Sequence, residues 1–323
     1  MRLGLSVYGT MYSMGMNEAS SRPRIRPREL IDKALELGLQ GVEVPVELMN
    51  GEDEIAIGQY ARDRQMFISL ETVGFDPIHL SEQLKVAARM GVPTLRTIVM
   101  GAKLGGDRRP MAGRWKSYLE DIHHGLRKAT EAAEKLGVTL AVENHQDIAS
   151  EELIELCESM ASNHFGIVFD TGSTLATADE PIEFCKKAAK YIKHVHLKDY
   201  ELYMSEEGFR LVRCPLGRGA IDFTAMFEVF VESCPDVTMA IEVGALEARE
   251  VRVFSEDYWP DYPPRTAVQF ARLMRFILTN AKLGEWRTPY ELGKPESEIM
   301  AYEEDQLQES VAYLKRTLSN FRT

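Results

Sequence analysis

The chain has 323 residues, 45% of them hydrophobic, which is enough to bury the core of one large α/β domain or two ordinary domains. Its 38 Lys and Arg against 50 Asp and Glu give a formal net charge of −12, which repels phosphate backbones and argues against nucleic acid as the substrate. No run of about 18 apolar residues occurs, and the N-terminus lacks the features of a signal peptide. We therefore expect a cytoplasmic protein with no membrane association.

Short apolar runs alternate with segments of helical periodicity up to residue 280. Several helical segments, such as PRELIDKALELG and SEQLKVAARMG, end at a glycine, where a left-handed residue can close the last turn. The runs are continuously apolar, which is typical of parallel strands covered by helices on both faces. Eight runs are predicted to be strands: 3–10, 41–46, 67–73, 94–101, 139–145, 165–171, 194–200 and 238–244.

Eight strand–helix units in about 250 residues predict a (β/α)8 TIM barrel, whose eighth helix is RTAVQFARLMRFILTN. An open doubly wound sheet is the alternative, but no GxGxxG follows the first strand. We predict a barrel domain over residues 1–281. Residues 282–323 are predicted to be a C-terminal helical extension that packs on the barrel or on another subunit, with an amphipathic helix over EDQLQESVAYLKRTLSNF.

Polar side chains close the last four predicted strands: Glu143, Asp170, His196 and Glu242. The C-terminal ends of barrel strands meet at one mouth, which carries the active site of such proteins. Three carboxylates crowded in a cleft would repel one another unless a cation neutralised them. Oxygen ligands with one imidazole suit Mn²⁺, Mg²⁺, Co²⁺ or Zn²⁺, and the hard donors favour Mn²⁺. The sequence therefore predicts one divalent metal ion bound by these four residues.

Further candidates lie next to the predicted ligands. His145 is two residues beyond Glu143, hence on the same side of the strand, and its ordinary pKa suits proton transfer near neutral pH. A hydrogen bond to a loop backbone is the alternative role of this histidine. His194, Lys198 and Arg218 are predicted to contact substrate. The alternatives are support of the metal ligand by His194, a structural ion pair of Lys198, and a structural role of Arg218 in its turn.

The segments VENH, FDTG, HVHLKDY, PLGRGAIDF and AIEVG, in this order and spacing, resemble the sugar phosphate isomerase/epimerase group of xylose-isomerase-like barrels. The likeness covers roughly residues 1–245. It implies that the four residues bind one divalent metal ion and that Glu143 and Glu242 also carry protons. In such enzymes the metal polarises a carbonyl and the adjacent hydroxyl group while a base removes the proton on the neighbouring carbon. The resemblance implies a ketose 3-epimerase or a sugar isomerase.

The motif ENH, together with the long aromatic segment EDYWPDYPPR after the eighth strand, also resembles a narrower family, the alpha subunit of C-glycoside deglycosidases. This resemblance implies a metal-dependent lyase that works with a smaller beta subunit in a hetero-oligomer. It implies cleavage of the carbon–carbon bond between a 3-oxo-glucosyl unit and an aromatic aglycone. A base such as His145 would take the proton beside the keto group, and the enolate would expel the anomeric substituent.

Four hypotheses therefore remain, in order of preference. The first is the C-glycoside deglycosidase alpha subunit, and the second is the ketose epimerase or isomerase. The third, a metal-dependent endonuclease of the abasic-site type, would need more metal-binding histidines and a basic surface. The fourth, a sugar-binding regulatory barrel, would leave Glu143 and Glu242 without a catalytic role.

Overall fold

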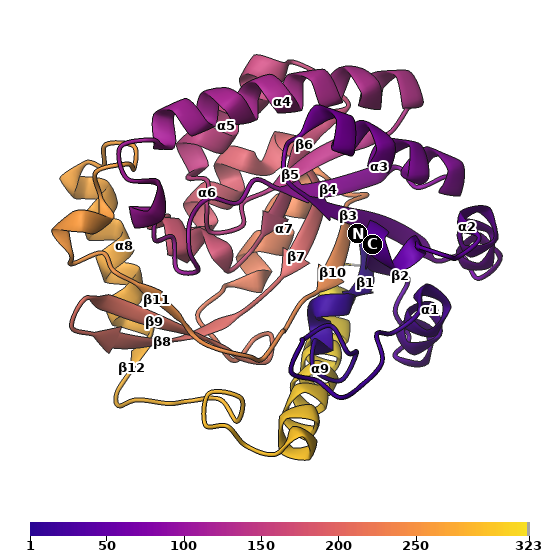
Figure 1. The fold of residues 1–323 in the computed structure, drawn as a ribbon. Coiled ribbons are helices and arrows are strands. Elements are labelled where there is room, and N and C mark those ends of the chain that lie inside the picture. The colour runs from indigo at the N-terminus through magenta and orange to yellow at the C-terminus, as the bar shows by residue number, and fades with distance from the viewer. Residues whose placement is uncertain (322–323) are drawn as a thin grey trace.

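The computed structural model describes residues 1–321 and shows eight parallel strands closed into a barrel (Figure 1). Each predicted apolar run supplies one barrel strand, so the predicted TIM barrel is confirmed. Around the barrel the order is β1-β2-β3-β4-β5-β6-β7-β10, which follows the chain. The strands are β1 (Arg2–Ser6), β2 (Gly41–Pro45), β3 (Phe67–Val73), β4 (Thr94–Ile98), β5 (Thr139–Glu143), β6 (Phe165–Asp170), β7 (Ile192–Leu197) and β10 (Thr238–Ile241).

Helices on the outside of the barrel cover the strands (Figure 1). Asp53, Asp76 and Asp222 cap helix N-termini by accepting backbone N–H bonds, and α3 and α4 end at the left-handed Gly91 and Gly137. The helices are α1 (Pro27–Glu36), α2 (Glu54–Asp63), α3 (Pro77–Met90), α4 (Trp115–Leu136), α5 (Ser150–Met160), α6 (Pro181–Ala188), α7 (Phe223–Ser233) and α8 (Ala267–Asn280). Short 3₁₀ helices are η1 (Val7–Thr10), η2 (Val46–Met49), η3 (Arg109–Met111), η4 (Ser173–Thr177), η5 (Ala189–Tyr191), η6 (Glu256–Tyr258) and η7 (Ser319–Phe321). No helix in residues 1–321 is both long enough and apolar enough to cross a membrane.

A second sheet, which the sequence analysis did not predict, lies beside the barrel next to α8 (Figure 1). The antiparallel hairpin of β8 (Tyr200–Ser205) and β9 (Gly208–Arg213) pairs with β11 (Arg249–Val251) and β12 (Ala281–Lys282). The seventh predicted strand ended at Tyr200, and no element was predicted over residues 201–213. The hairpin follows the end of β7 almost directly, so an apolar pattern alone does not separate the two strands.

The C-terminal helix α9 (Glu296–Leu318) packs on the barrel of its own chain. The buried carboxylate of Glu303 accepts backbone N–H bonds from Tyr12 at 3.0 Å and Ser13 at 2.9 Å. The helix begins at Glu296 rather than at the expected residue 304, because acidic residues in its first turn favour a helix N-terminus. The domain division at residue 281 stays a prediction.

Alternation along the strands separates an apolar layer from a charged barrel interior. In β2, Val42 and Val44 belong to the hydrophobic core, whereas Glu43 between them points the other way and is also buried. In β4, Leu95 is a core residue and its neighbour Arg96 is buried among charged groups. The barrel therefore carries a charged network inside a shell of apolar strand–helix contacts.

Candidate metal centre

The structure brings Glu143, Asp170, His196 and Glu242 together at the ends of four barrel strands. Each residue is buried and offers one ligand atom, and these atoms lie within 4.8 Å of one another. His196 Nδ1 is 2.8 Å from Glu242 Oε2 and 3.3 Å from Glu143 Oε1. Residues far apart in the sequence thus form one compact cluster at the mouth of the barrel.

The atoms of the cluster that face one another lack hydrogen-bond partners among residues 1–321. They are Glu143 Oε1, Asp170 Oδ2, His196 Nδ1 and Glu242 Oε2. A buried polar atom without a partner costs free energy, and crowded carboxylates repel one another. Carboxylate oxygens with one imidazole nitrogen are a suitable donor set for a divalent cation. The residues therefore fit a divalent metal ion, whose identity the donor set alone does not determine.

Backbone and amide groups orient the Asp170 carboxylate. Its Oδ1 accepts the N–H groups of Gly172 at 3.0 Å and Ser173 at 2.9 Å, which leaves Oδ2 directed at the cluster. The side chain of Asn144 donates to Asp170 O at 3.0 Å and accepts from Asp170 N at 2.7 Å. The asparagine of the ENH motif therefore ties the ends of β5 and β6 together and fixes the position of this ligand.

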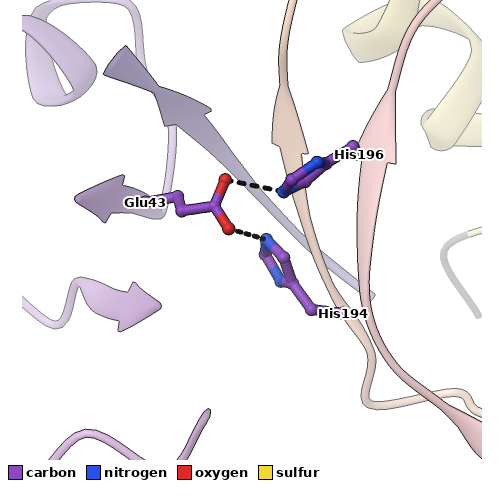
Figure 2. A group of neighbouring side chains, drawn as sticks. All are labelled: Glu43, His194 and His196. Atoms are coloured by element: carbon purple, nitrogen blue, oxygen red, sulfur yellow. Dashed lines mark ion pairs between the residues drawn. The ribbon is translucent and has the colours of Figure 1, made fainter. Parts of the chain in front are cut away.

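Glu43 contacts the imidazole of His196 on the side away from the carboxylate cluster. Figure 2 shows its carboxylate facing the rings of His194 and His196, with Oε2 at 2.7 Å from His196 Nε2 and Oε1 at 3.9 Å from His194 Nε2. A carboxylate on one ring nitrogen fixes the tautomer and leaves the other nitrogen free to bind a metal. Glu43 was not predicted from the sequence, where a single glutamate inside the apolar run GVEVPV is the signal that indicates it.

His194 lies inside the barrel, below the mouth where a substrate would bind. It is fully buried, and its Nδ1 is 2.7 Å from Thr238 Oγ1 at the start of β10. Burial lowers the pKa of His194 to about 4, so the ring is neutral near pH 7. This geometry matches the alternative of a supporting histidine, and the substrate contact predicted for His194 stays a prediction.

Arg96 on β4 holds the outer oxygen of Glu143. Its guanidinium group pairs with Glu143 Oε2 and with Glu71 Oε2, the latter at 3.1 Å. Glu143 Oε1 is thereby left for the cluster. Burial raises the pKa of Glu71 to about 8 even though Arg96 opposes this shift. Arg96 was not predicted from the sequence, where one arginine in the strand TLRTI is the only signal.

Lys198 lies among the predicted ligands. Its Nζ is 2.6 Å from Asp170 Oδ2, 2.7 Å from Glu242 Oε1 and 3.8 Å from Glu143 Oε1. Burial opposes the charge, but the three carboxylates outweigh burial and raise the pKa of Lys198 above its ordinary value. The structure therefore places Lys198 in a buried ion-pair network, and its contact with substrate stays a prediction.

The other two predicted residues lie outside this cluster. His145 Nδ1 is 3.1 Å from Asp147 Oδ2 and the side chain is 21% exposed. Within residues 1–321 no hydrogen bond or ion pair joins the His145 ring to the four clustered residues. Arg218 has an exposed side chain that pairs with Glu309 of α9 at 2.8 Å. The roles of His145 as a base and of Arg218 in substrate binding stay predictions.

A cavity of about 310 Å³ lies beside the charged network. Glu71 and Arg96 line it together with Tyr8, Thr72 and His79. This volume is at the lower end of the range for pockets that bind small molecules. Apolar Pro45, Val46 and Val73 also line it, so the cavity offers both polar and apolar contacts to a ligand.

A closed parallel barrel with a buried carboxylate–imidazole cluster at the strand ends defines a TIM-barrel protein whose mouth could hold a metal ion. Residues 31–252 match the family model described as xylose isomerase-like TIM barrel. The chain belongs to the xylose isomerase-like TIM barrel family. The predicted membership of a xylose-isomerase-like group is thus confirmed at the level of this family.

Individual relatives are distant. The chain is 26% identical over 230 residues to the uncharacterized protein YihM of Escherichia coli, which covers 69% of this chain and 67% of that protein. It is 22% identical over 250 residues to 3-oxo-isoapionate decarboxylase of Pectobacterium atrosepticum, and the match covers 75% of this chain and 85% of that protein. The fold is similar to D-psicose 3-epimerase of Clostridium cellulolyticum, with a TM-score of 0.64, 13% identity and full coverage of both chains. It is also similar to the zinc-bound IolI protein, with a TM-score of 0.57 and 16% identity, and the match covers 88% of this chain and 100% of that one.

Proposed function

We propose that this chain is a divalent-metal-dependent enzyme that removes a proton from the carbon next to the carbonyl group of a keto-sugar. The observation that carries the proposal is the convergence of four buried ligand atoms at the mouth of the barrel, none of which has a hydrogen-bond partner within residues 1–321. The relatives include a decarboxylase named for a 3-oxo sugar acid, and a similar fold is named as a sugar 3-epimerase. Decarboxylation of a 3-oxo acid and epimerisation beside a carbonyl both form an enolate, which supports this reaction class.

The metal would be held by Glu143, Asp170, His196 and Glu242. When bound, a divalent cation supplies Lewis-acid polarisation of substrate oxygens and so acidifies the neighbouring C–H bond. Manganese remains our first choice, with magnesium, cobalt and zinc as alternatives. Glu143 and Glu242 each keep one oxygen on a cation of the protein, Arg96 and Lys198 respectively. This contact fixes the rotation of each carboxylate, so its other oxygen is presented to the cluster.

His145 is the base in this proposal, with the two glutamates as the other proton carriers. The carboxylate of Asp147 lies next to His145 Nδ1 and favours the tautomer with its proton there. Nε2 is then the nitrogen that can accept a proton from substrate. The partly exposed position at the end of β5 gives the ring access to a ligand in the mouth.

The preferred reaction within this class is that of a C-glycoside deglycosidase alpha subunit. A base would take the C2 proton beside the 3-keto group of a 3-oxo-glucoside. The enolate would then form a C1–C2 double bond as the bond from C1 to the aglycone carbon breaks, and that carbon would keep the electron pair and take up a proton. The resemblance of the ENH and EDYWPDYPPR segments supports this choice. A smaller beta subunit, an oligomeric assembly and a cytoplasmic location belong to the same proposal. Ketose 3-epimerisation or isomerisation is the alternative and differs only in the fate of the enolate.

One experiment tests the reaction class and separates its two forms. The manganese-loaded chain is incubated in deuterated water with a 3-oxo C-glucoside and, separately, with simple ketoses. We expect aglycone release from the glucoside when the small partner protein is added. Solvent deuterium on a ketose carbon, produced by the chain alone, would favour the epimerase. If neither product forms and the chain binds no divalent ion, the proposed function is wrong.

The variant His145→Ala tests the assignment of the base. We expect it to bind manganese like the unmodified chain and to lose turnover by about 10²- to 10⁴-fold, the usual contribution of a general base. The control Glu242→Gln should weaken manganese binding as well as turnover. Loss of metal affinity in His145→Ala would instead assign this histidine to the ligand shell.

A further inference from the structure

Helices α4 and α5, which lie side by side on the outside of the barrel, enclose a cavity of about 420 Å³ (Figure 1). None of the four clustered residues lines this cavity. Residues three or four apart share one face of a helix, and each helix turns such a face toward the cavity. The facing side chains are Leu119, Ile122 and His123 of α4 and Glu155, Leu156 and Ser159 of α5. The volume lies in the range of pockets that bind small molecules.

Hydrogen bonds join the two helices at both ends of the cavity. At the end nearer the mouth, Trp115 Nε1 donates to Glu152 Oε1 at 2.8 Å. At the other end, His123 Nε2 lies 2.8 Å from Ser159 Oγ. These two bridges are about two turns apart on each helix, or about 11 Å. The helices are therefore held at both ends around a cavity that is already formed, so a ligand can enter without separating them.

The floor of the cavity is apolar and its rim is acidic. Ile122 and Ile148 of the floor are at most 1% exposed. Glu120 and Glu155, one from each helix, are exposed at the rim, and neither forms an ion pair within residues 1–321. Burial of an apolar group against the floor is favourable, and a protonated amine at the rim would lie beside two free carboxylates.

The other charges of the lining leave this acidic excess in place. The carboxylate of Glu152 is already paired with Arg108 Nη2 at 2.6 Å. Burial lowers the pKa of His123 below its ordinary value, so the ring is neutral near pH 7. Lys116 is the one charged cation of the lining and faces two unpaired carboxylates. The cavity therefore complements a ligand that is apolar and positively charged.

We propose that this cavity binds a small organic amine, with its apolar body on the floor and its ammonium group between Glu120 and Glu155. The binding site stands on the lining of the cavity alone and does not depend on the proposed function.

The same ligand acts as a regulator through a chain of contacts that begins at the cavity wall. Glu152 lines the cavity and holds Arg108, and Arg108 Nη2 donates to Asp147 O at 2.7 Å. Asp147 Oδ2 in turn lies 3.1 Å from His145 Nδ1. A ligand packed against Glu152 therefore restrains the loop that carries His145. This regulatory role rests on the proposed function, in which His145 is the base.

Isothermal titration calorimetry of the manganese-loaded full chain tests the site with 2-phenylethylamine and 2-phenylethanol, which share one ring and differ in charge. We expect the amine to bind about two- to fivefold more tightly than the alcohol. The double variant Glu120→Gln, Glu155→Gln should remove this difference and leave binding of the alcohol unchanged. Leu119→Trp places a larger ring at the cavity wall and should weaken binding of both probes at least about tenfold. The double variant changes only exposed side chains, so it tests the site even if Leu119→Trp fails to fold.

Glu158→Gln is the matched control, because Glu158 lies on the same helix, accepts a hydrogen bond from Tyr191 at 3.4 Å and does not line the cavity. It should bind the amine like the unmodified chain. The site is overturned if the amine does not bind, if it binds no more tightly than the alcohol, or if the double variant keeps the difference. Unchanged binding of both probes by a folded Leu119→Trp would also overturn it.

Hydrogen exchange measures the regulatory contact separately. The backbone amides of residues 144–149 should exchange more slowly in the amine-saturated chain than in the free chain. Unchanged exchange with the amine bound would overturn the regulatory role and leave the binding site standing. Neither measurement uses turnover, so failure of the proposed function and failure of this site give different results.

Discussion

Arg108, in the loop between β4 and α4, joins three of the loops that surround the barrel mouth. The side chain is 2% exposed and donates to Asp147 O at 2.7 Å, to Asp261 O at 2.6 Å and to the carboxylate of Glu152 at 2.6 Å. Its guanidinium carbon also lies 3.9 Å from the ring centroids of Trp115 and Tyr262. The loops after β4, β5 and β10 therefore share one buried cation.

The variant Arg108→Met keeps much of the side-chain volume and removes the charge and the donors. Two backbone carbonyls and the largely buried Glu152 carboxylate then lose their partner, although Trp115 Nε1 still donates to Glu152 at 2.8 Å. Removing one member of a buried ion pair costs about 3–5 kcal/mol. With an unfolding entropy of about 2.1 cal/mol/K per residue, a chain of 323 residues should lose about 4–7 °C in Tm.

Far-ultraviolet circular dichroism during heating measures the Tm of each variant and of the unmodified chain. The matched control is Arg109→Met, because Arg109 is the next residue, has a half-exposed side chain and pairs with Asp107 and Asp257. Exposed pairs contribute about 0–1 kcal/mol, so the control should shift Tm by less than about 2 °C. Equal shifts in the two variants would refute the assignment of Arg108 as the buried link between the loops.

Three further predictions concern the interior of the barrel. Glu43→Gln should weaken manganese binding by about 10- to 100-fold, because the carboxylate that orients the imidazole ligand is lost; equilibrium dialysis measures the affinity. Lys198→Met should strengthen manganese binding, because the Lys198 ammonium group contacts Asp170 Oδ2 and competes with the metal ion for this oxygen. Each 1.4 kcal/mol of this competition that is removed should raise the affinity about tenfold, which calorimetry measures. Burial raises the pKa of both Cys157 and Cys185 to about 12. At about pH 8 the thiolate fraction of each should therefore be about a thousandfold below that of a free thiol. Labelling of these thiols by a disulfide reagent should accelerate as the pH rises.

Each of these predictions has an outcome that contradicts it. Unchanged manganese affinity in Glu43→Gln would mean that the Glu43 contact does not orient the ligand. Weaker metal binding in Lys198→Met would mean that the ammonium group supports the site rather than competes with the cation. Rapid labelling of Cys157 or Cys185 in the native protein, at the rate seen in denaturant, would contradict their burial.

The barrel could be predicted because its signal is local. Each strand is a continuous apolar run followed by a helical period, and eight repeats of this unit leave few alternative folds. The four clustered residues could be predicted for the same reason, since each closes a strand and all strand ends of a barrel meet at one mouth. The hairpin of β8 and β9 was missed because it follows β7 without a turn signal that separates them.

The contacts across the barrel could not be predicted. Glu43 comes from β2, far from β7 in the sequence, and only closure of the barrel brings it to His196. Arg96 comes from β4, the neighbour of β5, but its pairing with Glu143 depends on the register of the two strands. The same holds for the cross-strand pair of Tyr200 and Arg213 in the second sheet, which depends on the register of β8 and β9. The sequence by itself determined the fold class and the four residues that cluster at the mouth, because strand periodicity is a local property. Only the tertiary structure decided which charges are paired and which are left for a ligand, because pairing depends on distances between side chains on separate strands.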